Sequence, residues 1–132
     1  MTTRTPTAQE IEALVAFLPR LYAEGFAPVK RWLGGTKRED GAYTMPYPEY
    51  DELVDAFVRA TSNECWLDYG YRPEAAGRML MDEDAVKIAD LAEIKSMLTY
   101  FVRGERFSDG HWGALIEGGQ VRRLLQRLAE LR

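Results

Sequence analysis

The chain has 132 residues, 46% of them hydrophobic and 29% charged, and a formal net charge of −4, which are ordinary values for one globular domain. The longest apolar run, residues 13–18, is too short to span a bilayer, and residues 1–6 lack the apolar stretch of a signal peptide. One cysteine excludes an internal disulfide, and one histidine excludes a zinc site built from His and Cys alone. We therefore expect a soluble, cytoplasmic protein without a disulfide scaffold.

The first predicted helix follows residues 1–6, which we expect to form a flexible tail. Thr7 and Glu10 have the spacing of a capping box, which favours a helix start. An apolar stripe with helical period then comprises Ile11, Leu14, Val15 and Leu18. Pro19 is predicted to end this helix or to kink it ahead of a further helix at residues 20–24.

Residues 26–47 lack a helical period and are rich in glycine and proline. Residues 29–33 and 42–45 could pair as a small β-hairpin within residues 29–45. An ordered loop would have the same composition, so both interpretations stay open.

Helical patterns resume at Pro48, which suits the first turn of a helix because its missing N–H is not needed there. Residues 50–61 carry an apolar stripe, whereas residues 65–71 are aromatic and aperiodic. Pro73 is predicted to open a short helix, and the acidic residues 82–84 are expected at the head of another.

The clearest amphipathic stripe covers residues 91–102, with Asp90 as its expected cap. Ser108 or Asp109 is predicted to cap the next helix, over residues 109–117. A last stripe runs to the end of the chain, and we expect the central positions of the two strong stripes to share one core: Leu98, Phe101, Leu124 and Leu128. The sequence thus predicts an all-α or nearly all-α bundle of five to six helices, with residues 7–132 as a single domain.

Three segments resemble an uncharacterised family of small bacterial proteins, a domain of unknown function. They are residues 45–50 (MPYPEY), 63–69 (NECWLDY) and 103–113 (RGERFSDGHWG). The resemblance covers residues 41–131. It implies a bacterial origin and a compact domain, and it assigns no site residue.

Residues 103–112 form the stretch richest in chemical groups. The candidate ligand-binding residues are Arg103, Glu105, Arg106, Asp109 and His111. Two guanidinium groups could clamp a phosphate or carboxylate, and Asp109 could orient His111 as a general base. In the structural alternative, these groups satisfy the ends of two helices and pair with each other.

The aromatic residues Tyr47, Trp66 and Tyr69 are candidates for a protein-partner surface, because Tyr and Trp are enriched at interfaces. The alternative is that such side chains pack in the core and at its rim. The charges interleaved with them are mostly acidic, and residues 41–100 hold five Lys/Arg against twelve Asp/Glu. Phosphate would be repelled there, so we expect no nucleic-acid partner from this segment.

The remaining motifs favour structural roles. Asp51 and Asp55 lack the further ligands of a cation site, and Cys65 has no basic neighbour that would favour a thiolate. We expect no metal and no cofactor. The C-terminal arginines are expected on a solvated helix face, with nucleic-acid contact as the alternative: Arg122, Arg123 and Arg127.

The sequence contains no complete catalytic set, which favours binding over catalysis. Our first hypothesis is a small cytosolic bacterial binding or regulatory module that acts through a protein-partner surface. The second is an enzyme or small-molecule binder with an anion-binding pocket at residues 103–111, and the third is a nucleic-acid accessory module. Convergence of the five candidate side chains on one concave pocket would favour the second hypothesis.

Overall fold

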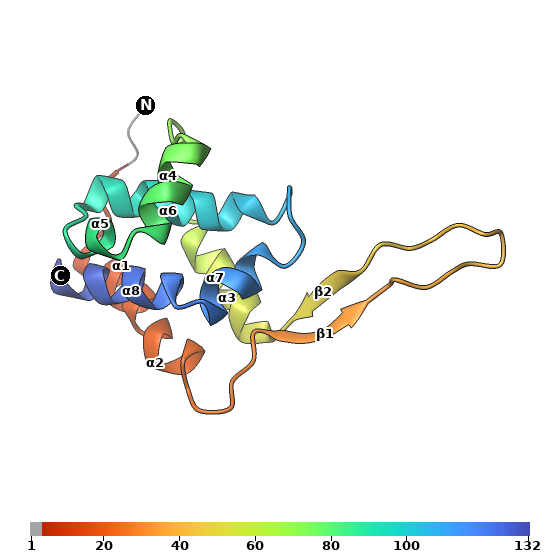
Figure 1. Ribbon diagram of the computed structural model, residues 1–132. Helices are drawn as coiled ribbons and strands as arrows, with labels where there is room; N and C mark the ends of the chain where they lie inside the picture. Colours follow the sequence, from red (N-terminus) through yellow and green to blue (C-terminus); the bar gives the residue numbers. More distant parts are fainter. Residues whose placement is uncertain (1–3) are drawn as a thin grey trace.

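A computed structural model describes residues 4–132 as a body of helices from which one long β-hairpin projects (Figure 1). The elements in chain order are α1 (Ala8–Val15), α2 (Phe17–Leu21), β1 (Val29–Leu33), β2 (Tyr47–Tyr50), α3 (Glu52–Thr61), the 3-10 helix η1 (Glu64–Trp66), α4 (Pro73–Met81), α5 (Glu83–Lys87), α6 (Leu91–Gly104), α7 (His111–Glu117) and α8 (Gln120–Glu130). The nearly all-α class is confirmed. Short turns divide the helical stretches more finely than the apolar stripes indicate.

The predicted capping boxes begin two of the helices. Thr7 accepts a hydrogen bond from the backbone N–H of Glu10, whose carboxylate accepts one from the backbone N–H of Thr7 at 2.9 Å. Asp90 makes the same reciprocal pair at the start of α6. Pro19 lies in the first turn of α2, where its missing N–H removes no helical bond, so the chain bends between α1 and α2 and continues.

The segment before α1 is held against the body from residue 4 onward. Arg4 forms two hydrogen bonds of 2.6 Å with the Glu10 carboxylate, and Lys95 donates to the carbonyl oxygen of Arg4 at 3.3 Å. Pro6 is buried. Residues 4–6 of the expected flexible tail are therefore anchored, and residues 1–3 lie outside the described part of the chain.

One apolar core joins the helices. Leu98 and Phe101 from α6 are buried in it together with Leu124 and Leu128 from α8, which confirms the predicted shared core. Phe101 lies 5.5 Å, centroid to centroid, from Phe57 on α3, in the tilted geometry that aromatic rings prefer. The long helix α6 thus supports both the body and the loop that follows it.

The aromatic segment after α3 is fixed to α6 by a buried hydroxyl. Thr99 accepts a hydrogen bond from the backbone N–H of Asp68 at 2.9 Å and donates to the carbonyl of Lys95 at 2.8 Å, so its hydroxyl is fully used. Trp66 is buried in the core, only 2% exposed. It cannot belong to a partner surface in this fold, which corrects its assignment from the sequence.

The projecting hairpin, residues 29–50, is called the arm below. Its strands β1 and β2 are antiparallel, with Leu33 opposite Tyr47 and Trp32 opposite Pro48. Of the two interpretations of this segment, the hairpin is confirmed and the ordered loop is not, but the second strand is Tyr47–Tyr50 and not residues 42–45. Residues 42–45 belong to the outer part of the arm.

Pro48 lies in a strand and does not begin a helix, which is a second correction. Both strands of the arm are edge strands, where the missing N–H of a proline is tolerated. Helix α3 begins only at Glu52, and Asp51 caps it by accepting a hydrogen bond from the N–H of Leu53 at 2.9 Å.

The part of the arm beyond the paired strands, residues 34–46, is called the outer arm, and it is ordered by its own hydrogen bonds. The N–H of Gly35 donates to the carbonyl of Thr44 and the N–H of Arg38 to that of Ala42, both at 2.7 Å. Gly34 has φ +76°, and a Cβ there would lie 2.5 Å from the carbonyl oxygen of Met45, so this position requires glycine. The arm therefore extends well beyond the paired strands and away from the helices (Figure 1).

Candidate functional site

The corner, residues 103–113, connects α6 to α7 and is held by one carboxylate. Glu105 accepts hydrogen bonds from the backbone N–H groups of Gly110 and Trp112, both at 2.9 Å. These groups lie at the start of α7, where helix N–H groups lack intrahelical partners. Helix α7 begins at His111, and its cap residue Gly110 has φ +93°.

The prediction that Ser108 or Asp109 caps this helix is therefore wrong. Both residues are exposed, and α7 begins two residues later than Asp109. The capping carboxylate comes from Glu105, which lies just beyond the end of α6. As a result, one side chain links the two helices.

Glu105 also binds the root of the arm. The hydroxyl of Tyr50, at the end of β2, donates to Glu105 at 2.8 Å and accepts from the N–H of Gly113 at 3.3 Å. Burial raises the pKa of the Tyr50 hydroxyl. A Cβ on Gly113 would lie 2.9 Å from a methyl carbon of Val29, so glycine allows α7 to pack directly on the arm.

His111 has a packing role in this corner. Its ring lies edge-on to Tyr100, with 5.0 Å between ring centroids, and its Nε2 is 3.3 Å from the carbonyl oxygen of Tyr100. A Cβ on Gly104 would lie 2.1 Å from Nε2, so only glycine fits there. Burial lowers the pKa of His111. Asp109 makes no hydrogen bond to His111 within the described chain, so the predicted acid–base pair is not assembled.

A cavity of about 510 Å³, called the groove below, lies where the corner meets the end of α3. It is lined by Ser62, Leu67, Val102, Arg103, Glu105, Arg106 and Trp112. Three of the five candidate ligand-binding residues therefore converge, whereas Asp109 and His111 lie outside the lining. Ser62 and Leu67 are distant in sequence, and no local pattern indicates their part in it.

Arg103 and Arg106 are the basic residues of the groove. The guanidinium carbon of Arg103 lies 5.4 Å from the ring centroid of Tyr71, a cation–π contact. In the part of the chain that the structure describes, neither arginine forms an ion pair with a carboxylate. The pairing between Glu105 and Arg106 that the structural alternative included is therefore absent there.

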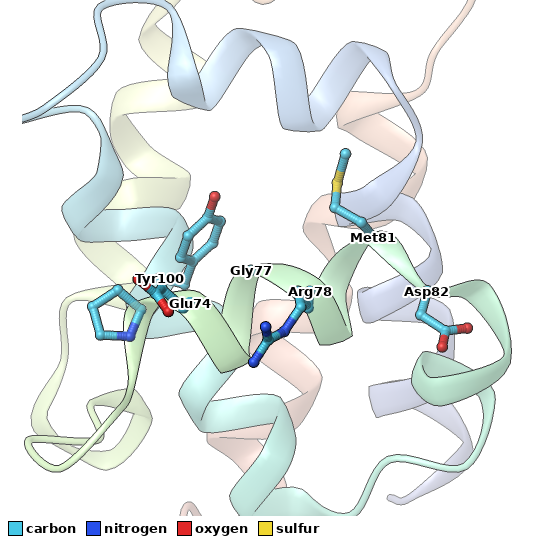
Figure 2. A pocket seen from close by; sticks show the side chains of 7 residues that line it. Glu74, Gly77, Arg78, Met81, Asp82 and Tyr100 are labelled. Atoms are coloured by element: carbon cyan, nitrogen blue, oxygen red, sulfur yellow. The ribbon is translucent and has the colours of Figure 1, made fainter.

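A second cavity, of about 660 Å³, lies along α4 (Figure 2). Gly77 leaves space for Tyr100 from α6, since a Cβ there would lie 2.9 Å from the tyrosine ring. Glu74 and Asp82 lie toward opposite ends of the cavity, with Arg78 between them (Figure 2). The mixed charges do not converge on one point, so the lining indicates no particular ligand.

Four exposed aromatic or large apolar side chains lie on the arm, and the other exposed ones are spread over the helical body: Tyr69, Met81, Ile88, Phe107 and Leu131. Tyr47, from the predicted partner surface, is half-exposed, and so is Tyr69 on the loop before α4. Three further exposed residues lie on the arm: Trp32, Tyr43 and Met45. Their exposure depends on how the arm leaves the body, which no local pattern reveals.

Cys65 and the C-terminal arginines, which the sequence also singled out, are buried or make contacts within the protein. Cys65 is buried, which raises the pKa of its thiol to about 11. Of the C-terminal arginines, Arg122 lies over the Tyr22 ring, Arg123 pairs with Glu83 at 3.5 Å, and Arg127 donates to the carbonyl of Ala89. Residues 4–132 contain no group of three or more His, Cys, Asp or Glu side chains arranged to hold a metal ion.

Comparison with known proteins gives a family but no activity. A model of the family of unknown function DUF6508 matches residues 6–132. The chain belongs to this family. The match to DUF6508 confirms the resemblance found from the sequence and extends it to nearly the whole chain. No curated protein and no solved structure matches the chain. No helix within residues 4–132 is both long enough and apolar enough to cross a membrane.

Proposed function

We propose that this protein is a binding module that holds a protein partner with its arm. The observation that carries the proposal is the exposure of four large apolar side chains on one projecting element. Trp32, Tyr43, Met45 and Tyr47 are between 50% and 76% exposed. Aromatic residues and methionine are enriched in protein interfaces, and large apolar groups clustered on an exposed surface favour association.

The backbone of the arm supports the same proposal. Its sheet has only two strands, so each strand has one edge without a neighbour within residues 4–132. A two-stranded hairpin on its own is only marginally stable in water, and an added strand from another chain would pair with such an edge. The internal bonds of the arm, such as that from the N–H of Thr44 to the carbonyl of Thr36 at 3.0 Å, fix its shape before binding.

Two pairs of charged side chains lie near the base of the arm, where they neutralise each other. Lys30 pairs with Glu52 at 2.6 Å, and Arg31 pairs with Glu49 across the two strands. The charges of these four side chains are therefore satisfied within the protein, whereas the exposed Trp32 and Tyr47 on the same strands have apolar surface free for a partner. A reduced, cytoplasmic setting in a bacterial cell is part of the proposal, since the only cysteine is buried as a free thiol.

The test is site-specific photo-crosslinking in extract of the native host. A photoreactive amino acid replaces Tyr43 on the arm or, as the control, Gln126 on the exposed side of α8. We expect a defined adduct from position 43 only. Excess unlabelled wild-type chain should suppress it, whereas a variant with residues 34–46 replaced by Asn-Gly should not.

Two outcomes of the crosslinking experiment matter most: one would contradict the proposal, and the other would identify the partner. Equal adducts from both positions, or equal competition by the shortened variant, would contradict a role of the arm in binding. An adduct with twice the mass of the chain would identify the partner as a second copy.

A further inference from the structure

We infer that the groove binds a small organic monoanion, a carboxylate carried on an apolar body. This site is separate from the exposed surface of the arm. The inference depends on the charges at the groove, on its apolar wall and on the absence of a reactive group.

The net charge of the side chains that line the groove matches a ligand with one negative charge. Arg103 and Arg106 contribute two guanidinium groups that have no carboxylate partner within residues 4–132. Glu105 also lines the groove, but its carboxylate accepts three hydrogen bonds, from Tyr50, Gly110 and Trp112. The net local charge is therefore about +1, which matches a carboxylate better than a dianionic phosphate, and guanidinium groups bind carboxylates in a forked geometry.

The two arginines differ in how far they are already positioned. Arg103 is half-buried and its guanidinium carbon lies 5.4 Å from the centroid of the Tyr71 ring, which restricts its motion. Arg106 is exposed and can turn toward an anion that Arg103 holds.

The wall of the groove is apolar and already rigid. Trp112 donates its indole N–H to the carbonyl of Val102 at 3.2 Å, and its ring lies 5.3 Å from that of Tyr50, centroid to centroid. Leu67 and Val102 complete the apolar part of the lining. A volume of about 510 Å³ lies within the range typical of small-molecule sites.

The lining offers binding groups and no reactive ones. The Ser62 hydroxyl donates to the carbonyl of Val58 at 2.7 Å, and the Glu105 carboxylate is occupied. His111 faces the Tyr100 carbonyl and does not line the groove. The groove is therefore suited to recognise a carboxylate and not to convert it.

The experiment titrates the full-length protein with benzoate, 2-naphthoate and decanoate, and with the corresponding neutral amides. Calorimetry gives the affinity, and the indole N–H signal of Trp112 in an NMR spectrum reports the location. We expect at least one carboxylate to bind and to shift that signal, with an affinity about tenfold higher than that of its amide.

Two variants separate the groove from general surface charge. Arg106→Gln should weaken binding of that carboxylate about tenfold, because it removes one charge-assisted hydrogen bond. Arg59→Gln removes one exposed guanidinium from α3 and should leave the affinity unchanged. The NMR spectra also show whether each variant is folded.

The inference would be overturned if no carboxylate bound more tightly than its amide, or if Arg106→Gln and Arg59→Gln had equal effects. Neither result would affect the proposed function of the arm, because photo-crosslinking at Tyr43 does not involve the groove.

Discussion

Glu105 shows how one side chain can hold three parts of a small protein together. Its two oxygens accept hydrogen bonds from the first turn of α7 and from the tyrosine at the root of the arm. A carboxylate with several donors is a strong acceptor, and all three donors would lose their partner if the side chain were removed. The structure of the corner therefore depends on the hydrogen bonds that the Glu105 side chain accepts more than on the shape of that side chain.

We predict that Glu105→Gln lowers the free energy of unfolding by about 1–3 kcal/mol, since the amide NH₂ cannot accept from a backbone N–H and leaves that donor unpaired. Urea denaturation measures the change. Glu24→Gln, an exposed position after α2, is the matched control and should have almost no effect. Equal unfolding midpoints for the two variants would show that the corner does not need the charge.

His111 predicts a pH dependence of stability. Its pKa is lowered by burial, although the Tyr100 carbonyl and the Glu105 charge act in the opposite direction. Because the unfolded chain takes up a proton more readily, the free energy of unfolding is highest above the ordinary histidine pKa of about 6.5 and falls as the pH decreases below it.

In His111→Gln this part of the pH dependence should disappear. Urea midpoints at about pH 7.5 and about pH 5.5 test it, since these values lie on either side of the ordinary histidine pKa. If wild type and variant lose the same stability over this interval, His111 is not held neutral in the folded protein.

At the scale of elements, the arm and the helical body differ in what stabilises them. None of the buried core residues comes from residues 29–49, and the hydrogen bonds within the outer arm join residues of the arm to each other. The body is stabilised by burial of apolar side chains from all the long helices.

We predict that replacing residues 34–46 with Asn-Gly changes the free energy of unfolding by less than about 0.5 kcal/mol, as expected for surface changes away from the core. An Asn-Gly turn favours a tight hairpin, so Leu33 and Tyr47 can keep their pairing. Thermal unfolding measures the effect. A drop in Tm of many degrees would mean that the outer arm supports the body.

Local patterns predicted the helix starts at Thr7 and Asp90, because a capping box involves residues only three positions apart. The pairing of Leu33 with Tyr47 could not be predicted in the same way, since it joins residues across a long turn. Pro48 suited both a strand edge and a first helical turn, and the tertiary pairing decided between them.

The candidate site was predictable in part, for a similar reason. Arg103, Glu105 and Arg106 are close in sequence and could be grouped from it. The cap that Glu105 provides for α7 depends on how the loop folds back, and Ser62 joins the groove only through packing of α3 beside α6. Contacts of this kind carry no local signal.

At the scale of the whole molecule, the shared core of α6 and α8 decides stability. We predict that Leu98→Ala lowers the free energy of unfolding by about 2–5 kcal/mol, the usual range when a buried leucine is truncated. Leu131→Ala is the control, because this leucine is 38% exposed. Calorimetric or urea unfolding would contradict the prediction if both variants lost equally little.

The charge layout predicts weak interaction with nucleic acid. Residues 41–100 hold seven more acidic than basic residues, and Arg123 and Arg127 of α8 are engaged within the molecule. Nonspecific DNA binding requires a basic surface that displaces counterions from phosphates. Fluorescence anisotropy with a duplex at physiological salt should detect no binding, and a micromolar dissociation constant with a steep salt dependence would contradict this.

Because the arm is long, a small rotation at its root moves its tip by a large distance. From Tyr50 to the turn at Gly41 a strand of this length spans about 30 Å, so a tilt of about 10° at the root would displace the tip by about 5 Å. That root is fixed by the Tyr50–Glu105 hydrogen bond and by the contact between Val29 and Gly113. Small changes in these two contacts would therefore alter how far the tip moves in solution. They would also alter the distance at which the tip can first touch a partner.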